Sequence, residues 1–291
     1  MRISLSITNV SWPGGAAALP GSLATIAAAA EDAGLDTVWL ADHLFQADPA
    51  SEPGEPALEA YTALGFLAGR TSRVRLGTLV TGAIFRAPSL LVKAVTTLDV
   101  LSGGRAWLGI GTGYNDTEAA AMGIDMPPVP VRLDRLADTL DLARRMWAGD
   151  ESPFEGRTTR LERPIGSPRP ITSPHPPVLI GGTGPRRTLR LVAEQADACN
   201  LFDIPDGGVA VRRQLDVLAG HCAAVGRPFD EIEKTITAAL HPGETPEGFV
   251  ERCHALAELG IQHAIVITRG RPWTTGDVRT IGTAVRPLAA A

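Results

Sequence analysis

A histidine that directly follows an apolar run is the first candidate for chemistry in this 291-residue sequence. His43 comes after residues 37–42, TVWLAD, whose β-branched and apolar side chains are typical of a buried strand. An imidazole titrates near neutral pH, so at a strand end it could exchange a proton with a bound substrate. The alternative is a histidine that packs against its neighbours or caps a helix, and the residue alone does not decide between the two.

Metal binding is not indicated by the other histidines or by the cysteines. Asp42 and His43 would point to opposite faces of a continuing strand, so they make a poor pair of metal ligands. The remaining histidines lack H-x-x-x-H and H-E-x-x-H spacings; they are His175, His221, His241, His254 and His263. The cysteines, which lack a C-x-x-C spacing and are expected to be buried reduced thiols, are Cys199, Cys222 and Cys253.

Two glycine clusters follow other apolar runs. Residues 181–184, Gly-Gly-Thr-Gly, lie between a predicted strand and a predicted helix, where backbone N–H groups could approach a phosphate. No Gly-Lys-Ser/Thr follows, so the segment is not a Walker loop, and a plain tight turn is the alternative. Residues 109–113, Gly-Ile-Gly-Thr-Gly, lack the dinucleotide-binding G-x-G-x-x-G spacing, but small residues there would let a flat ring lie close to the backbone.

The elements that must position these residues alternate along the whole chain. Strands are predicted at 2–8, 37–42, 74–80, 105–111, 177–182, 197–202, 235–240 and 263–268. Helices are predicted at 21–33, 57–69, 88–102, 116–122, 132–148, 185–195, 209–225, 246–259 and 274–289. Eight strands in strict alternation with helices favour one (β/α)8 TIM-barrel domain over residues 1–291, with functional residues at the C-terminal ends of its strands.

Two long polar segments interrupt the pattern. Residues 149–176, rich in Pro, Gly, Arg and Ser, form an insertion loop after the fourth βα unit, and residues 44–56 form a loop after the second strand. Loops as long as the first are usually active-site elements or disordered. We expect these two loops to decide the substrate, although neither carries a recognisable motif.

Composition excludes several classes of partner. A net charge of −5 provides no electrostatic footprint for nucleic acid. No run of 18 apolar residues is present, so no transmembrane helix is expected. The N-terminus lacks a basic segment followed by a long apolar run, so we expect no secretory signal and a cytoplasmic protein that acts on a small molecule.

Four segments taken in order resemble the bacterial-luciferase-like monooxygenase superfamily. They are TVWLADHLF (37–45), VRLGTLVTGAIFRAP (74–88), GGRAWLGIGTGYN (103–115) and PPVLIGGTGPRRTLRLVAEQADACNLF (176–202). The resemblance covers nearly the whole chain, and Asp-His at the second strand end is most similar to the branch that uses the deazaflavin coenzyme F420. It implies a flavin or deazaflavin at the C-terminal ends of the strands, and a homodimer.

The resemblance also implies roles for individual residues. His43 matches the histidine that faces the deazaflavin and handles a proton in F420-dependent members. Leu79-Val80 matches a dipeptide whose non-proline cis peptide bulges against the ring. The full set of implied cofactor-binding residues is Asp42, His43, Thr78, Leu79, Val80, Gly111, Thr112, Gly113, Gly181, Gly182, Thr183 and Gly184.

One departure from the family concerns the substrate. The sugar-phosphate dehydrogenases of this branch carry a glutamate and an asparagine where this chain has Tyr114 and Thr117, which argues against oxidation of glucose 6-phosphate. Tyr114 would present a phenol to the substrate or form a wall of the pocket.

The resulting expectation is an F420-dependent oxidoreductase that passes a hydride between the deazaflavin and an unidentified organic substrate. His43 would act as the acid/base or as an orienting group. The alternatives are an FMN-dependent monooxygenase, because the same barrel serves both cofactors, and a barrel that binds cofactor without turnover.

Overall fold

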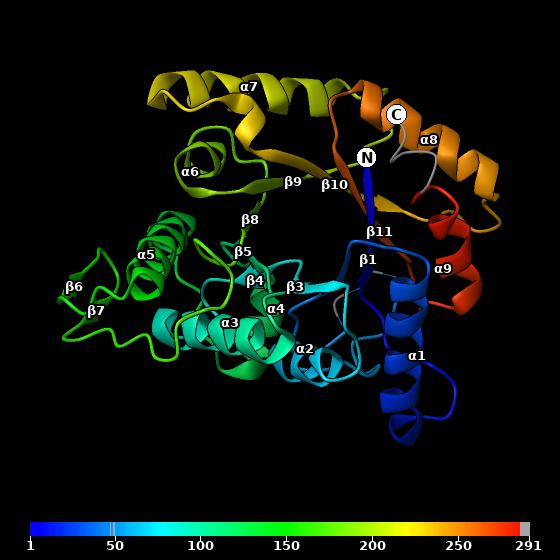
Figure 1. The fold of residues 1–291 in the computed structure, drawn as a ribbon, viewed down its shortest axis with the longest axis horizontal. Helices are drawn as coiled ribbons and strands as arrows, with labels where there is room; N and C mark the ends of the chain where they lie inside the picture. The colour runs from blue at the N-terminus through cyan, green and yellow to red at the C-terminus, as the bar shows by residue number, and fades with distance from the viewer. Residues whose placement is uncertain (47, 49, 286–291) are drawn as a thin grey trace.

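Nine parallel strands form the sheet of the computed structural model, which describes residues 1–46, 48 and 50–285 (Figure 1). In sheet order the strands are β3 (Arg75–Thr78), β2 (Thr37–Leu40), β1 (Arg2–Ile7), β11 (His263–Ile267), β10 (Glu233–Ala239), β9 (Ala198–Phe202), β8 (Val178–Gly181), β5 (Leu108–Gly111) and β4 (Thr81–Gly82). Every neighbouring pair is parallel, as expected when helices connect successive strands.

The sheet closes between β3 and the segment before β5. Leu76 forms a parallel bridge with Ala106, and Trp107 N donates to Leu76 O at 2.8 Å. The predicted third strand, 74–80, is interrupted after Thr78 by Leu79 and Val80, and β4 continues beyond them. Counting β3 and β4 as one position, eight strand positions surround the barrel, so the predicted fold class is confirmed.

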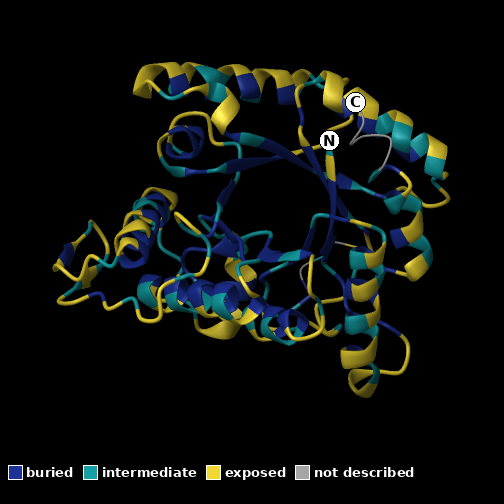
Figure 2. Ribbon diagram, viewed as in Figure 1, coloured by how far each residue is buried: buried dark blue, intermediate teal, exposed yellow. Residues whose placement is uncertain are grey.

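Helices cover the outside of the barrel. They are α1 (Leu19–Asp32), α2 (Ala60–Ala68), α3 (Pro88–Ser102), α4 (Asp116–Met122), α5 (Val129–Ala148), α6 (Thr188–Gln195), α7 (Val209–Val225), α8 (Pro246–Glu258) and α9 (Thr275–Gly282), with 3-10 turns at Ala16–Ala18 and Phe229–Glu231. Figure 2 shows the buried faces of these helices turned toward the strands. The last helix was predicted to reach 289, of which 286–289 lie outside the described residues. Among the described helices, none is both long and apolar enough to cross a membrane.

The barrel interior is packed rather than hollow. A cluster separate from the core beneath the helices fills it; its buried members are Trp39, Trp107, Leu179, Ala198 and Ile265. The two indole rings lie 5.6 Å apart between centroids. Leu79 and Val80 pack on this cluster, so they form a floor at the C-terminal end of the barrel.

A buried polar network joins four strands at the opposite end. Ser4 Oγ lies 2.6 Å from His263 Nε2, and His263 Nδ1 lies 3.0 Å from Glu233 Oε1. Thr37 N donates to Ser4 Oγ at 2.9 Å. Burial alone would raise the pKa of Glu233, but the hydrogen bond and charge of His263, with nearby arginines, hold it below its usual range. His263 is therefore a structural residue that ties strand starts together.

The insertion 149–176 lies at that same N-terminal end, because it follows α5 and precedes β8. It is not wholly irregular, since β6 (Phe154–Glu155) and β7 (Arg160–Leu161) pair as a short antiparallel hairpin. The buried carboxylate of Asp99 on α3 accepts hydrogen bonds from the backbone N–H groups of residues 171 and 172, at 2.7 and 2.9 Å. The end of the loop is thus held against α3.

Candidate active site

A cavity of about 440 Å³ lies at the C-terminal ends of the barrel strands. Every strand position contributes to its wall, in most cases through a residue at the strand end; one from each is Ile7, Leu40, Val80, Gly111, Gly181, Phe202, Thr237 and Ile267. This is the end of a (β/α)8 barrel at which enzymes of this fold carry their active sites.

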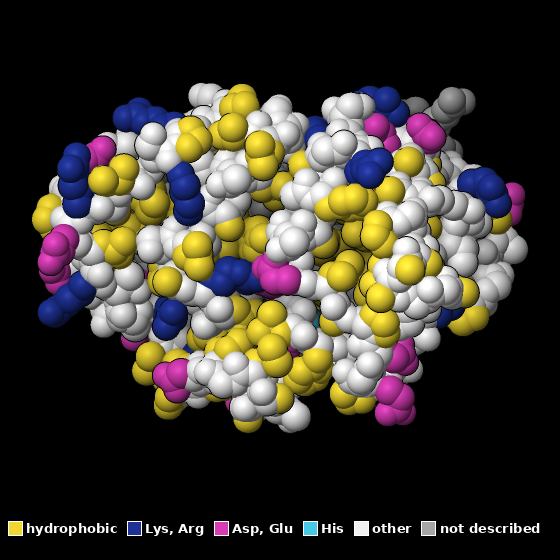
Figure 3. All heavy atoms as spheres, turned by 90° about the horizontal axis from the view of Figure 1, so that it is seen from below, with side chains coloured by type: hydrophobic (Ala, Val, Ile, Leu, Met, Phe, Trp, Pro, Cys, Tyr) yellow, Lys and Arg dark blue, Asp and Glu magenta, His cyan; other side chains and the backbone are white. Residues whose placement is uncertain are grey.

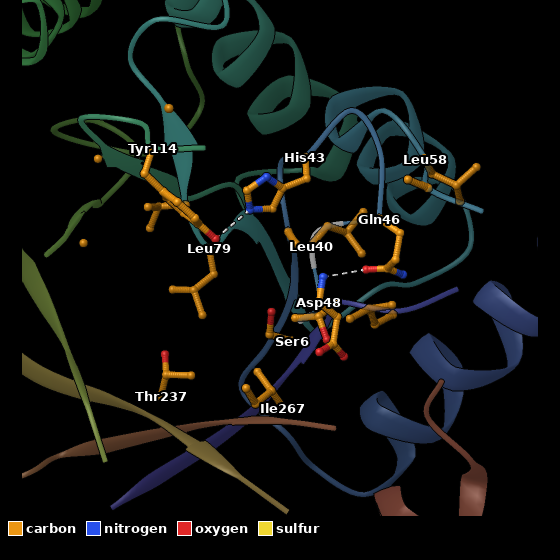
Figure 4. Close-up of a pocket in the computed structure, with 18 of the residues that line it drawn as sticks. Ser6, Leu40, His43, Gln46, Asp48, Leu58, Leu79, Tyr114, Thr237 and Ile267 are labelled. Carbon is orange, nitrogen blue, oxygen red and sulfur yellow. Dashed lines mark hydrogen bonds between the residues drawn. The ribbon is translucent and has the colours of Figure 1, made fainter. Parts of the chain in front are cut away.

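His43 lies between a carboxylate and a phenol at the edge of this cavity, and Figure 4 shows its contact with the phenol. Its Nδ1 lies 2.7 Å from Glu118 Oε2, and its Nε2 lies 3.2 Å from the hydroxyl of Tyr114. The two rings meet edge to face, with centroids 5.4 Å apart. These side chains come from three places: the loop after β2, the loop after β5, and the first turn of α4.

Glu118 is a partner of His43 that the sequence analysis did not single out. Its side chain is fully buried, and its backbone N–H donates to Asn115 Oδ1, the N-cap of α4, at 3.1 Å. The carboxylate also accepts a hydrogen bond from Leu44 N. A buried carboxylate is tolerated only with such partners, and the helix N-terminus favours its charge. The spacing Asn115-x-x-Glu118 is an N-capping signal that could have drawn attention to it.

The geometry fixes how His43 shares its protons. A carboxylate can only accept, and Glu118 already accepts from Leu44 N, so Nδ1 of His43 is the donor toward it. In a neutral imidazole, Nε2 is then an acceptor, and the hydroxyl of Tyr114 donates to it. Partial desolvation of its hydroxyl at the cavity edge, and then the negative charge of Glu118, raise the pKa of Tyr114, so the phenol stays protonated. The acceptor nitrogen of an imidazole held by a carboxylate is therefore paired with the phenol at the edge of the cavity.

Asp42 points away from the cavity and is almost fully buried. Its two carboxylate oxygens accept from Arg86, at 2.6 and 2.9 Å, and Arg86 also contacts Glu59 and lies over the Tyr61 ring. Asp42 therefore anchors the loop that follows β4 and makes no wall of the cavity. The opposite orientations of Asp42 and His43 agree with strand alternation.

The segment Thr78–Val80 is divided between core and cavity. Thr78 is fully buried, where its hydroxyl lies 2.8 Å from Thr81 Oγ1 and 2.9 Å from Gly109 O. Leu79 and Val80 line the cavity, and the peptide bond between them is cis, as the resemblance implied. Thr78 thus supports the floor from below, without facing a ligand.

Glycines on both sides of Val80 give its side chain room. A Cβ atom on Gly181 would lie 2.9 Å from Val80 Cγ2, and one on Gly111 would lie 3.0 Å from the same atom. Gly113 has φ +80°, and a Cβ there would lie 2.9 Å from Ile84 Cγ1. These positions require glycine for the packing of the floor, and they leave bare backbone toward the cavity.

The turn at 181–184 connects the cavity with the start of α6. Gly181 and Gly182 line the cavity, with Gly182 at φ +117°, whereas Thr183 and Gly184 do not line it and lead away toward Thr188. Thr112, from the other glycine cluster, lines it as well. A turn of this kind before a helix N-terminus suits a phosphate group.

Polar groups opposite His43 could form hydrogen bonds with a ligand. Ser6 is fully buried and lines the cavity, and its Oγ has no hydrogen-bond partner among the described residues. Asn200 Nδ2 donates to Thr237 Oγ1 at 3.0 Å beside it. An apolar floor, bare glycine backbone, an unpaired hydroxyl and a phosphate-type turn together fit a flat ring with a polar edge and a phosphate tail.

Only one of the two long loops reaches this cavity. Phe45, Gln46 and Asp48 line it, whereas no residue of the segment 149–176, all of which is described, does so. The expectation that 149–176 helps to decide the substrate is wrong, because it connects a helix to the next strand, and such loops lie at the other end of the barrel. Residues 47 and 49 lie outside the described part of the first loop.

Comparisons with known proteins identify the family. The family model for luciferase-like monooxygenases matches residues 1–289. Two F420-dependent glucose-6-phosphate dehydrogenases are similar in sequence: that of Kineococcus radiotolerans is 32% identical over 83% of this chain and 70% of its own length, and that of Microbacterium testaceum is 30% identical over 77% and 65%. The chain therefore spans about two thirds of the length of these relatives.

Solved structures share the fold. An F420-dependent secondary alcohol dehydrogenase in complex with an F420-acetone adduct superposes with a TM-score of 0.82 at 18% identity, covering 99% of this chain and 98% of that one. The oxygenating constituent of 3,6-diketocamphane monooxygenase from Pseudomonas putida, in complex with FMN, gives 0.76 at 14% identity, covering 99% and 98%. With the family model spanning almost the whole sequence, the chain belongs to the luciferase-like monooxygenase family.

Proposed function

We propose that this chain is an F420-dependent oxidoreductase that transfers a hydride between the deazaflavin and an organic substrate. The observation that carries the proposal is the His43–Glu118 pair at a cavity at the strand ends, with His43 Nε2 bonded to the Tyr114 hydroxyl, which also lines that cavity. The similarity to F420-dependent relatives supports the choice of cofactor. FMN is the alternative, because a structural neighbour with the same barrel is in complex with it.

Different residues around the cavity would contact different parts of this cofactor. Leu79 and Val80 would support the ring, the backbone at 111–113 would flank it, and the buried Ser6 hydroxyl would bond its polar edge. The turn at 181–184 would hold the phosphate. When bound, F420 supplies a carbon, C5, that accepts or donates a hydride.

His43 handles the proton that accompanies the hydride. In the oxidative direction, a substrate hydroxyl would replace the Tyr114 hydroxyl at Nε2 and give its proton to that atom, and the Glu118 carboxylate would stabilise the imidazolium that results. In the reductive direction, the same atom returns the proton. Tyr114, at the position of the glutamate of the sugar-phosphate dehydrogenases, would turn its hydroxyl from Nε2 to the reacting oxygen, and its raised pKa would keep it protonated.

A side-by-side fluorescence titration with F420 and FMN tests the cofactor. We expect F420 to bind with micromolar or better affinity and FMN at least tenfold more weakly, a difference of about 1.4 kcal/mol in binding free energy. Tighter binding of FMN would overturn the F420 assignment and favour the monooxygenase.

We also propose that residues 1–291 form a single domain, that the protein is a homodimer, and that it acts in the cytoplasm. The resemblance to the family is the basis for the dimer. Light scattering of the purified protein measures the mass directly, and a monomeric mass at micromolar concentration would contradict it. Cell fractionation tests the compartment.

A further inference from the structure

Arg86 is a charged residue inside the protein to which the proposed function gives no task. On the face in Figure 3, acidic and basic side chains are interspersed at the surface. Arg86, by contrast, has only 12% of its side chain exposed. A guanidinium with so little hydration is stable only where hydrogen bonds and opposite charges compensate for the water that it has lost. The partners of Arg86 therefore show what this residue holds in place.

The first partner of Arg86 is the residue directly before His43. Both carboxylate oxygens of Asp42 accept from the guanidinium, at 2.6 and 2.9 Å, and a bidentate contact of this kind fixes direction as well as distance. Glu59, the N-cap of α2, contacts the same guanidinium. Burial alone would lower the pKa of Arg86, but the hydrogen bonds and the charge of Asp42 raise it, so the residue stays charged.

His43 is consequently anchored on both sides along the chain. Asp42, before it, is held by Arg86. Leu44, after it, donates its backbone N–H to the carboxylate of Glu118. Because both neighbours are fixed, the point at which the imidazole leaves the backbone is fixed as well, and Nδ1 of the ring meets the carboxylate at 2.7 Å. Arg86 therefore helps to direct the His43 ring through Asp42.

A second set of contacts connects Arg86 with the floor of the cavity. The guanidinium lies 4.8 Å from the centroid of the Tyr61 ring. The Tyr61 hydroxyl lies 2.9 Å from Thr81 Oγ1, which in turn lies 2.8 Å from Thr78 Oγ1. These two threonines directly precede and follow Leu79-Val80, the dipeptide that forms the floor. The same guanidinium is therefore linked to the floor through one aromatic ring and two hydroxyl groups.

We propose that Arg86 is a positioning residue that holds His43 and the floor in one fixed relation, so that the proton-handling nitrogen and the cofactor ring meet the substrate together. The inference rests on the proposed F420-dependent function for its cofactor half. An error of about 1 Å in such a relation can cost about 10²-fold in rate. Arg86 is not among the described residues that line the cavity, so it acts through its neighbours rather than on a ligand.

Three conservative variants separate the two connections. Asp42→Asn removes the charge that Arg86 holds beside His43 and keeps the shape of the side chain. Tyr61→Phe removes only the hydroxyl that contacts the threonines. Arg86→Lys keeps the positive charge but loses the planar fork, so it weakens both connections.

The first readout is the nitrogen NMR spectrum of His43 in the ligand-free protein. Isotope-labelled histidine gives separate signals for a protonated and a bare ring nitrogen, and the His43→Ala variant assigns them. At about pH 8.5, where an ordinary imidazole is neutral, the wild type should show a protonated Nδ1 and a bare Nε2. In Asp42→Asn and Arg86→Lys the two signals should move toward each other, because a ring that is held less firmly exchanges between its tautomers. In Tyr61→Phe they should stay in place.

The second readout is the affinity for F420 in a fluorescence titration. Tyr61→Phe and Arg86→Lys should weaken F420 binding several-fold, because the floor beneath the ring loses its support. Asp42→Asn should weaken it less than either. Unchanged affinity in both Tyr61→Phe and Arg86→Lys would refute the connection with the floor.

Arg75→Lys is the matched control. Arg75 pairs with Asp36 at 2.6 Å and lies 4.6 Å from the centroid of the Trp107 ring, so it makes the same kinds of contact at the first residue of β3, away from the cavity. The control should lower the melting temperature and leave both readouts unchanged. If Arg86→Lys also lowers only the melting temperature, Arg86 has a structural role alone and the inference is overturned.

The two readouts also separate this inference from the proposed function. If the wild type does not bind F420, the proposed function fails, whereas the His43 spectrum still tests Arg86 in the free protein. If F420 binds and the His43 spectrum of Arg86→Lys equals that of the wild type, the function remains and the positioning of His43 by Arg86 is refuted.

Discussion

Glu118→Gln is the most informative single substitution in this site. Glutamine has nearly the same shape as glutamate, and its amide oxygen can still accept the hydrogen bond from Leu44 N. The substitution therefore removes the charge beside His43 while the packing of α4 is retained. Because the amide NH2 group then faces Nδ1, it also favours the tautomer that carries its proton on Nε2, which lowers kcat in the same direction. We expect cofactor affinity and melting temperature to change little and kcat to fall.

The size of the loss follows from the geometry. Glu118 Oε2 lies 2.7 Å from His43 Nδ1, which places the centres of the two charges about 4 Å apart in the imidazolium state. At an effective dielectric constant of about 20, their attraction is about 4 kcal/mol. If the proton is half transferred in the transition state, loss of this attraction would cost about 2 kcal/mol and lower kcat about 30-fold. If it is fully transferred, kcat would fall about 1,000-fold.

The assay compares kcat, KM and melting temperature for the wild type and three variants. Glu118→Asp, which keeps the charge on a shorter side chain, should recover part of the kcat lost in Glu118→Gln. Glu247→Gln is the matched control, because Glu247 also lies in the first turn of a helix but is exposed. Wild-type kcat in Glu118→Gln, with the fold intact, would refute the argument that this carboxylate assists proton transfer.

Three further substitutions test separate parts of the molecule. His43→Ala should spare F420 binding and lower kcat more than tenfold; a variant with unchanged kcat and a reduced melting temperature would show a packing role instead. Gly182→Val should weaken F420 binding while the barrel still folds, because Gly182 has φ +117° beside the phosphate turn, and unchanged affinity would make the turn merely structural. Glu31→Gln tests acid stability. Burial alone would raise the pKa of Glu31, but backbone N–H groups of residues 72–74 hold it at about 2 against an ordinary 4.5. Its stabilisation is therefore present above pH 4.5 and is lost as the pH falls toward 2, so urea unfolding at pH 7 should show a loss of about 1–2 kcal/mol after solvent screening, shrinking at acid pH. Equal losses at pH 7 and pH 3 would contradict that origin.

The strands and helices of the barrel could be predicted from the sequence because the signals that mark them lie within each segment. Strand and helix periodicity is visible within each segment, and all eight predicted strand positions are occupied. The third strand was predicted as continuous over 74–80, and its interruption after Thr78 was not expected; the resemblance implied only the cis peptide at Leu79-Val80. Nothing local indicates that a Cβ on Gly109 would lie 1.8 Å from Thr78 O, because that contact joins two strands.

The partners of the site residues could not be predicted from the sequence, because they too come from distant segments of the chain. His43 and Glu118 are 75 residues apart, and Asp42 and Arg86 are 44 apart, so only the closed barrel brings each pair together. Alternation did predict that Asp42 and His43 diverge. It could not say that Asp42 would be held by Arg86, away from any ligand.

The role expected for the insertion 149–176 was wrong because of where the insertion lies in the order of elements, not because of its length or composition. Its length and composition suited an active-site loop, but the loops that line a barrel's active site follow strands, not helices. The order of the predicted elements already places this loop between α5 and β8. That order alone excludes this loop from the active-site end of the barrel.

The same position divides the chain into two half-barrels with different parts of the site. His43, Tyr114 and Glu118 precede the insertion, whereas the turn at 181–184 and Thr237 follow it. A cut within the β6–β7 hairpin, remote from the cavity, would therefore separate the proton-handling side chains from the proposed phosphate turn. Neither fragment alone would hold a whole site, so F420-dependent turnover regained on mixing would report reassembly of the barrel, which makes this protein a candidate for a split-enzyme reporter.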